Sequence, residues 1–359
     1  MIAFIAWTPL HVINILNTKL TYYADVEADL YIYDEFNGAQ TVYQNMLKEK
    51  VFKNVYLVDH KKIGNKLISK INVLLNINRM IKLNKKLDYD IIFTQGGNYF
   101  LKILYGQTKK NNPHVKLNYI EDGLATYLNL RLLNISDVRR KIMNILNPYS
   151  MFLAEITDYY LYEPNLTTID QCFQLNQLSV IEKEGILYEK LKRIFGLPAE
   201  TKKIENALLF LDQPLEKDGY KVHEKTILTT VKQYSLNKKF LVKLHPRTSP
   251  ESYGKDSEIF ETSLPLELCF LAYDLQDTVI VSCVSTASFT PRMMFGLTNE
   301  VILLSEMVRN DREFSTEDER TQHVLKGVSD FYERYHSIGY HNVRMPINKE
   351  ELKLVLEGE

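Results

Sequence analysis

Three polar motifs stand directly after apolar runs of the chain and carry side chains suited to group transfer. They are Glu121-Asp122-Gly123 after Val115 to Ile120, His245-Pro246-Arg247 after Lys239 to Leu244, and Ser285-Thr286 after Asp277 to Ser282. The apolar runs predict buried strands. Because open α/β sheets bind ligands beyond the carboxyl ends of their strands, a carboxylate, an imidazole and two hydroxyls placed there outline an active site.

Asp122 is the candidate general base of this outline. A carboxylate beside a glycine, which lets a ligand approach the backbone, is suited to take a proton from a hydroxyl nucleophile. Glu121 points elsewhere if the chain is still extended, since successive side chains alternate. An ordinary turn, with Asp122 bonded to nearby amides, is the competing interpretation.

His245 is the candidate partner of a leaving phosphate, because an imidazole donates a proton or a hydrogen bond near neutral pH. Pro246 fixes the turn behind it, and Lys243 and Arg247 add positive charge to the same region. A lone histidine is more often structural than catalytic, but this one precedes a proline and an arginine at a strand end. The combination favours an anion site.

The Ser285-Thr286 pair predicts a phosphate cradle. Ser285 is expected to cap a helix running to about Phe295, and both hydroxyls and the free amides of the first turn would receive a phosphate. Simple capping is the competing interpretation. Gly96 and Gly97 also follow a predicted strand and allow close approach of a ligand.

No motif in the sequence predicts a metal or a cofactor. The eight histidines show no paired-ligand spacing, and there is no Walker A or GxGxxG pattern. Asp88-Tyr89-Asp90 has the form of a DxD metal motif but precedes its predicted strand, so we expect it at the amino end, away from the site.

Composition bounds the class of protein. The 359 residues carry 45% hydrophobic and 25% charged side chains with a net charge of -1, which indicates a globular protein and argues against a dedicated nucleic-acid binder. Three widely spaced cysteines predict free thiols in a reducing compartment. With no signal peptide and no membrane-spanning run, we expect a cytoplasmic protein.

The elements that would position these motifs alternate along the chain, which predicts parallel βαβ units. Thr8 caps a helix from Pro9 to Tyr23. Apolar runs predict strands at Ile2 to Ala6, Ala28 to Tyr33, Asn54 to Val58, Asp90 to Thr94, Val115 to Ile120, Asn206 to Asp212, Lys239 to Leu244, Asp277 to Ser282 and Glu300 to Leu304. We therefore expect two α/β domains, 1–198 and 206–340, joined by a linker at 199–205 and followed by a helical segment, 341–359.

Lys61 to Lys86 holds eight lysines and arginines and no acidic residue, interleaved with apolar residues. A basic amphipathic helix of this kind can lie on an anionic membrane surface at the inner face of the cell membrane. A surface helix packed on the sheet is the favoured interpretation, and the two are compatible.

Together, the acidic-Asp-Gly motif, the His-Pro motif and the Ser-Thr pair resemble those of bacterial sialyltransferases, most closely the lipooligosaccharide and capsule enzymes of glycosyltransferase family 52. Thr8-Pro9-Leu10 before a helix is similar too. The resemblance spans the chain thinly, with an unassigned middle from about residue 128 to 180. It departs from the family pattern at Thr286, where the family has serine.

The resemblance implies a GT-B fold, two Rossmann-like domains facing across a cleft, with CMP-sialic acid as the donor and a glycan such as a terminal galactoside as the acceptor. It implies that Asp122 is the base, that His245 stabilises the departing phosphate, and that Ser285 and Thr286 hold this phosphate. It further implies cytosine contact by Lys243 and ribose contact by Glu267. Metal independence is expected because the donor carries a single phosphate, and inversion is expected from in-line displacement with a base on one side and an acid on the other.

Two alternatives stay open. One is another GT-B transferase of envelope polymers: a polysialyl- or Kdo-type enzyme, or a CDP-polyol phosphotransferase. The other is a non-catalytic, peripheral membrane module that binds nucleotides and is anchored by the basic stretch.

Overall fold

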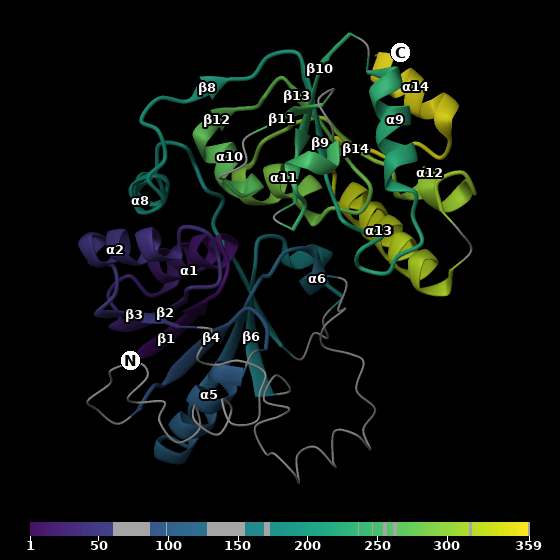
Figure 1. Cartoon of the computed structure of the whole chain (residues 1–359). Coiled ribbons are helices and arrows are strands. Elements are labelled where there is room, and N and C mark those ends of the chain that lie inside the picture. The colour runs from purple at the N-terminus through teal and green to yellow at the C-terminus, as the bar shows by residue number, and fades with distance from the viewer. Residues whose placement is uncertain are drawn as a thin grey trace. The chain divides into compact units, whose positions relative to one another are not determined.

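The computed structural model describes residues 1–59, 87–97, 99–127, 155–168, 173–235, 237–245, 247–253, 257–260, 264–315 and 318–357. The chain divides into two compact units, Met1–Leu197 and Pro198–Glu359 (Figure 1). This division lies beside the predicted linker. Part of the linker nevertheless forms a short strand, β8 (Lys202–Lys203), which pairs with β12 (Tyr273–Asp274) of the second unit.

The first unit contains a parallel sheet of seven strands in the order β3-β2-β1-β4-β5-β6-β7. The strands are β1 (Ile2–Ala6), β2 (Ala28–Tyr33), β3 (Asn54–Val58), β4 (Ile91–Thr94), β5 (Lys116–Ile120), β6 (Ile156–Leu161) and β7 (Gln174–Gln177). The helices are α1 (Pro9–Tyr22), α2 (Ala39–Glu49), α5 (Tyr99–Asn111), α6 (Leu124–Tyr127) and α8 (Ile186–Phe195), with a 3-10 turn at Pro164–Leu166.

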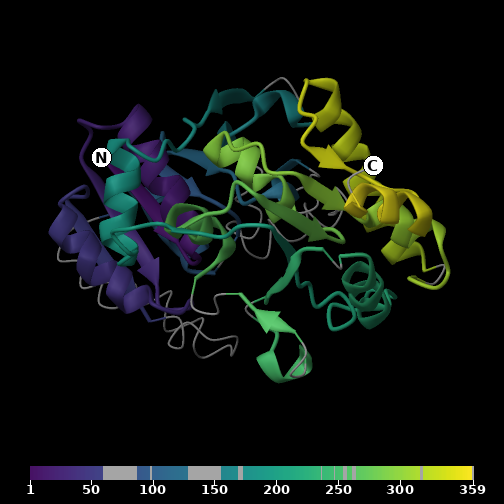
Figure 2. The ribbon, with the colours of Figure 1, turned by 90° about the horizontal axis from the view of Figure 1, so that it is seen from above.

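Helices cover both faces of this sheet, which explains why every residue of β1 and β2 is buried. The chain runs from β1 to β3 in one direction and from β4 to β7 in the other. Because parallel crossovers are right-handed, this reversal places α1 and α2 on one face and α5 on the other (Figure 1). Helix α8, late in the unit, packs beside α1 and α2 (Figures 1 and 2).

The second unit repeats the same order with six strands, β11-β10-β9-β13-β14-β15, all parallel. The strands are β9 (Ala207–Leu211), β10 (Lys239–Lys243), β11 (Glu258–Ile259), β13 (Thr278–Ser282), β14 (Val301–Leu303) and β15 (Val343–Arg344). The helices are α9 (Glu224–Tyr234), α10 (Leu266–Ala272), α11 (Thr290–Phe295), α12 (Ser305–Asn310), α13 (Glu319–Ser337) and α14 (Lys349–Glu357), with 3-10 turns at Pro250–Tyr253 and Thr286–Ser288. In sequence order, both sheets follow the Rossmann arrangement 3-2-1-4-5-6.

Every strand predicted from an apolar run is present, with bounds that differ by at most one residue at either end. The segment 341–359 is not helix alone, because it supplies the edge strand β15 before α14. The basic stretch Lys61 to Lys86 lies outside the described residues. Among the helices that the structure describes, none has the length and apolar character needed to cross a membrane.

Candidate functional site

In the first unit, the predicted site residues follow three neighbouring strands. Thr8 comes after β1, Gly96 and Gly97 after β4, and Asp122 after β5, and these strands are adjacent in the sheet. The order reverses between β1 and β4, which is the switch point where open α/β sheets bind ligands. The first unit therefore brings these residues to one edge of its sheet.

Helix α1 begins where the sequence predicted. Thr8 is its N-cap and accepts a hydrogen bond from the backbone N–H of His11 at 3.2 Å, with Pro9 at the first helical position. The Thr8 hydroxyl is thus engaged in capping, as the sequence predicted.

Asp122 stands in the turn between β5 and α6. Gly123 adopts φ 66, a left-handed conformation that glycine reaches at low cost. The backbone N–H of Asp122 donates to the hydroxyl of Thr126 at 3.0 Å, which fixes the turn. The Asp122 side chain keeps 13% exposure, so solvent or a ligand can reach it.

His11 is a site residue that the sequence analysis missed. Its Nε2 lies 2.9 Å from Oδ1 of Asp122, and its side chain has 0% exposure. The signal was the series of polar residues His11, Asn14 and Asn17, spaced three residues apart on α1. All three are buried.

Glu121 faces inward, as the alternation of side chains predicted. Its carboxylate accepts hydrogen bonds from the hydroxyl of Tyr127 and from the backbone N–H of Tyr162 at 2.8 Å. Burial raises its pKa to about 7, against the opposing effect of the hydrogen bond from Tyr127. Glu121 is 5% exposed, and these hydrogen bonds join the Asp122 turn to the interior of the first unit.

Asn14 connects α1 to the same network. Its amide donates to the carbonyl of Glu121 at 2.8 Å and its Oδ1 accepts from the hydroxyl of Tyr162 at 2.9 Å. These bonds tie the helix that carries His11 to the strand that carries Asp122. The relative position of the two side chains is therefore fixed by the packing of the unit.

In the second unit, three adjacent strand ends again meet at a point where the strand order reverses. Strand β9 lies between β10 and β13, and the segments that follow them carry Asp212, His245 and Ser285. Asp212 was missed because it was counted as the last residue of a strand. The rule that selected Asp122 and His245, a polar side chain directly after a buried strand, applies to it equally.

Asp212 holds the backbone of the His245 turn. Its Oδ2 accepts from the backbone N–H of His245 at 3.0 Å, and its Oδ1 accepts from the hydroxyl of Tyr253. The carboxylate is 9% exposed. Burial and the cation of Arg247 lower the pKa of His245, so the imidazole is mainly neutral at neutral pH.

The ring of His245 has a defined orientation. Its Nδ1 accepts from the backbone N–H of Arg247 at 3.2 Å, so in the neutral ring the proton resides on Nε2. The guanidinium of Arg247 forms two hydrogen bonds with Asp218, at 2.6 and 2.7 Å, on the exposed surface. Arg247 is thus held by Asp218. Pro246 lies outside the described residues.

Lys243 and Glu267, predicted as nucleoside contacts, influence each other electrostatically. Burial raises the pKa of the Glu267 carboxyl, and the charge of Lys243 opposes that rise. Lys243 is 7% exposed at the end of β10, and Glu267 lies in the first turn of α10. The second unit therefore brings this pair together near the end of a strand.

The helix predicted from Ser285 to Phe295 is wrong in one respect. A 3-10 turn covers Thr286–Ser288, and α11 begins only at Thr290. Pro291 has no N–H to donate to an earlier turn, so it is accommodated in a first turn and starts a separate helix. The hydroxyl oxygen of Ser285 accepts from the backbone N–H of Ala287 at 3.3 Å, which leaves its own O–H as a donor.

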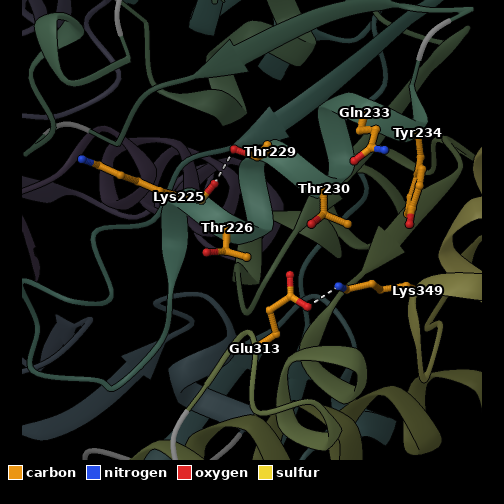
Figure 3. Close-up of a pocket in the computed structure, with 8 residues that line it drawn as sticks. All are labelled: Lys225, Thr226, Thr229, Thr230, Gln233, Tyr234, Glu313 and Lys349. Atoms are coloured by element: carbon orange, nitrogen blue, oxygen red, sulfur yellow. Dashed lines mark hydrogen bonds and ion pairs between the residues drawn. The ribbon is translucent and has the colours of Figure 1, made fainter.

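A pocket of about 350 Å³ lies elsewhere in the second unit (Figure 3). One side of α9 lines it with Thr226 and Thr230, opposite an ion pair between Glu313 and Lys349. No predicted site residue lines this pocket. Among the described residues, no three histidine, cysteine, aspartate or glutamate side chains group as a metal site would require.

The solved structures that this chain resembles share its fold at low sequence identity. A UDP-N-acetylglucosamine 2-epimerase, described as putative, from Listeria monocytogenes matches with a TM-score of 0.54 at 12% identity, covering 100% of this chain and 88% of that one. MnaA of S. aureus, solved with UDP, matches with a TM-score of 0.50 at 12% identity, covering 99% and 87%. These matches concern the fold, which is GT-B, with two Rossmann-like units in tandem.

The family is shown by the sequence. Residues 3–305 match the model of the alpha-2,8-polysialyltransferase family, and the chain belongs to that family. No curated protein sequence matches significantly. The resemblance to bacterial sialyltransferases is confirmed, and polysialyl transfer is one of the alternatives that the sequence left open. The chain is a glycosyltransferase.

Proposed function

We propose that this protein transfers sialic acid from CMP-sialic acid to a hydroxyl of a surface glycan, with inversion and without a metal ion. The observation that carries the proposal is Asp122: a partly exposed carboxylate at a strand end, held by a buried histidine, in a chain whose residues 3–305 match a polysialyltransferase family.

Asp122 acts as the general base. A hydroxyl becomes a useful nucleophile when a carboxylate takes its proton as the new bond forms. The exposed part of the Asp122 side chain receives that proton, and Gly123, which has no side chain, lets a sugar approach the backbone. Base-assisted attack on the face opposite the leaving CMP gives inversion at the anomeric carbon.

His245 stabilises the phosphate of CMP as it leaves. Its neutral ring presents Nε2–H as a hydrogen-bond donor, because Nδ1 is occupied by the N–H of Arg247. A preformed donor of this kind is worth most where negative charge develops in the transition state. The approaching phosphate also favours the imidazolium, so His245 can pass its proton to the leaving group.

The remaining contacts follow the chemistry of the donor. The O–H of Ser285 and the Thr286 residue bind the phosphate, Glu267 accepts from the ribose hydroxyls, and Lys243 contacts the cytosine carbonyl. A monophosphate carries less charge than the diphosphate of most nucleotide sugars, so fixed hydrogen-bond donors suffice without a divalent ion.

A terminal sialic acid is the acceptor that the family name favours, in place of the galactoside expected from the sequence. Both acceptors present a hydroxyl to the same base, so the chemistry at Asp122 is unchanged. The difference lies in the rest of the acceptor, and direct competition between the two compounds decides it.

The test uses the purified full chain with CMP-sialic acid, EDTA and either a galactoside or a sialylated galactoside. CMP release and product mass are measured for the wild type, for Asp122→Asn and for Asp25→Asn. Asp25 is an exposed carboxylate before β2, remote from the carboxyl ends of the strands. Asp122→Asn should lower kcat roughly 100-fold or more, while Asp25→Asn should match the wild type. A wild type that releases no CMP with either acceptor contradicts the proposal.

A further inference from the structure

His11 is buried, titratable and in contact with the proposed base. It lies in the first turn of α1 with 0% side-chain exposure, and its Nε2 is 2.9 Å from Oδ1 of Asp122. A buried polar side chain normally has its hydrogen bonds satisfied, and here one of them is made to a carboxylate that a ligand can reach.

The other ring nitrogen shows where the proton resides. Nδ1 of His11 faces the backbone N–H of Trp7 at 3.4 Å, so Nδ1 is the acceptor. The proton then belongs on Nε2, and the ring donates it to Oδ1 of Asp122. The indole of Trp7 packs edge-on against the imidazole, with ring centroids 4.4 Å apart, and limits rotation of the ring.

The backbone of His11 is equally constrained. Its N–H is capped by Thr8, and its carbonyl accepts from the side-chain amide of Gln95 at 3.3 Å. Strands β1 and β4 therefore both contribute to the placement of the imidazole. Because segments that follow two neighbouring strands hold the imidazole, its Nε2–H has little freedom to move. It therefore fixes the orientation of the Asp122 carboxylate.

We propose that His11 is a positioning residue: its Nε2–H holds the Asp122 carboxylate in one orientation, ready to accept a proton from the acceptor hydroxyl. Its role in turnover rests on the proposed function. His11 itself is sealed from solvent, whereas Asp122 keeps 13% exposure, so the substrate meets the carboxylate and not the imidazole.

Acidic residues lie near Asp122, where His11 supplies its hydrogen-bond donor. Glu121 lies next to Asp122 in the sequence and interacts with it electrostatically, and Glu163 interacts with Glu121 in turn. The hydroxyls of Tyr127 and Tyr162 belong to the same hydrogen-bond network. Among these acidic neighbours, Nε2–H of His11 supplies a hydrogen-bond donor to Oδ1 of Asp122.

The kinetic test compares His11→Leu, which removes the donor, with His11→Gln, whose amide nitrogen can reach the position of Nε2. His114→Leu, at an exposed histidine before β5, is the matched control. His11→Leu should lower kcat roughly 10- to 100-fold with KM within about twofold.

His11→Gln should recover at least about tenfold of that loss, because it restores an N–H donor. Equal activity of His11→Leu and His11→Gln, or a change confined to KM, overturns the proposal. Such a result identifies a merely structural histidine.

A second readout does not depend on turnover. Nitrogen NMR of histidine-labelled protein, with the His11 signals assigned from their loss in His11→Gln, should show a proton on Nε2 whose resonance shifts in Asp122→Asn. A proton on Nδ1, or a resonance unmoved by Asp122→Asn, overturns the pairing. If the wild type shows no transferase activity but this signature is present, the proposed function fails and the pairing stands.

Discussion

Replacing Asp212 with alanine should destabilise the second unit far more than replacing Asp218, although both aspartates contact the segment around His245. Asp212 is 9% exposed and accepts from the backbone N–H of His245 and from the hydroxyl of Tyr253. A hydrogen bond to a charged group contributes about 1.5–3 kcal/mol, and loss of the acceptor leaves two donors in a mostly buried site. We expect Asp212→Ala to lower the free energy of unfolding by about 3 kcal/mol.

Asp218→Ala is the matched control. Asp218 pairs with Arg247 at the surface, where their side chains are 33% and 56% exposed. An exposed ion pair of this kind contributes at most about 1 kcal/mol, so the control should stay within that limit.

The assay is urea unfolding followed by circular dichroism, with hydrogen exchange of residues 239–245 to locate the effect. Asp212→Ala should lower the protection of these residues, and Asp218→Ala should not. The single tryptophan, Trp7, lies in the first unit and gives a fluorescence signal for that unit alone. Equal losses of stability in the two variants would refute the assignment of Asp212 as the support of the His245 turn.

Three further outcomes follow from buried or paired groups. Glu121 has a pKa raised to about 7, so between about pH 4.5 and 7 it is protonated in the folded protein but charged in the unfolded chain. The free energy of unfolding should therefore fall as pH rises through that window, by at most about 3 kcal/mol. Glu121→Gln should flatten this dependence in urea titrations. Hydrogen bonds from Arg193 lower the pKa of Glu49 to about 2. The stability that the Glu49 carboxylate contributes should therefore be lost as pH falls from about 4.5 towards 2. In acid titrations, Glu49→Gln should remove that loss. Burial raises the pKa of Cys283 to about 12, and Cys269 is also buried, so a thiol reagent near pH 8 should modify these two cysteines only after unfolding. Peptide mass spectrometry locates the label, and rapid modification of Cys269 or Cys283 in the native protein would contradict this.

The sequence predicts the sheets well because buried parallel strands leave a strong local signature. Short apolar runs such as Ile2–Ala6 and Thr278–Ser282 are bounded by polar turns, and the structure makes them central strands. Strand order is not encoded locally. The apolar runs themselves do not predict that β4 lies beside β1. This strand order nevertheless brings Thr8, Gly96 and Asp122 to one edge of the sheet.

The sequence indicates candidate site residues where a polar side chain directly follows a strand, and it gives no sign of residues that join the candidate site through a contact from a distant element. His11 becomes a candidate site residue only because β5 places Asp122 against α1, in a contact between residues 111 positions apart in the sequence. Asp212 also directly follows a buried strand, but the sequence analysis counted it as the last residue of that strand. The helix after Ser285 was started too early because Pro291 was not weighed as a helix start, whereas its end at Phe295 was predicted correctly.

The measurement that tests the central claim most directly is the anomeric configuration of the first product, determined by NMR. The wild-type chain is incubated with CMP-sialic acid and a sialylated acceptor, and the new linkage is compared with that of the donor. The account, with Asp122 as base and His245 at the leaving phosphate, predicts a sialoside of inverted configuration. A product with the configuration of the donor, or free sialic acid as the sole product, would contradict it.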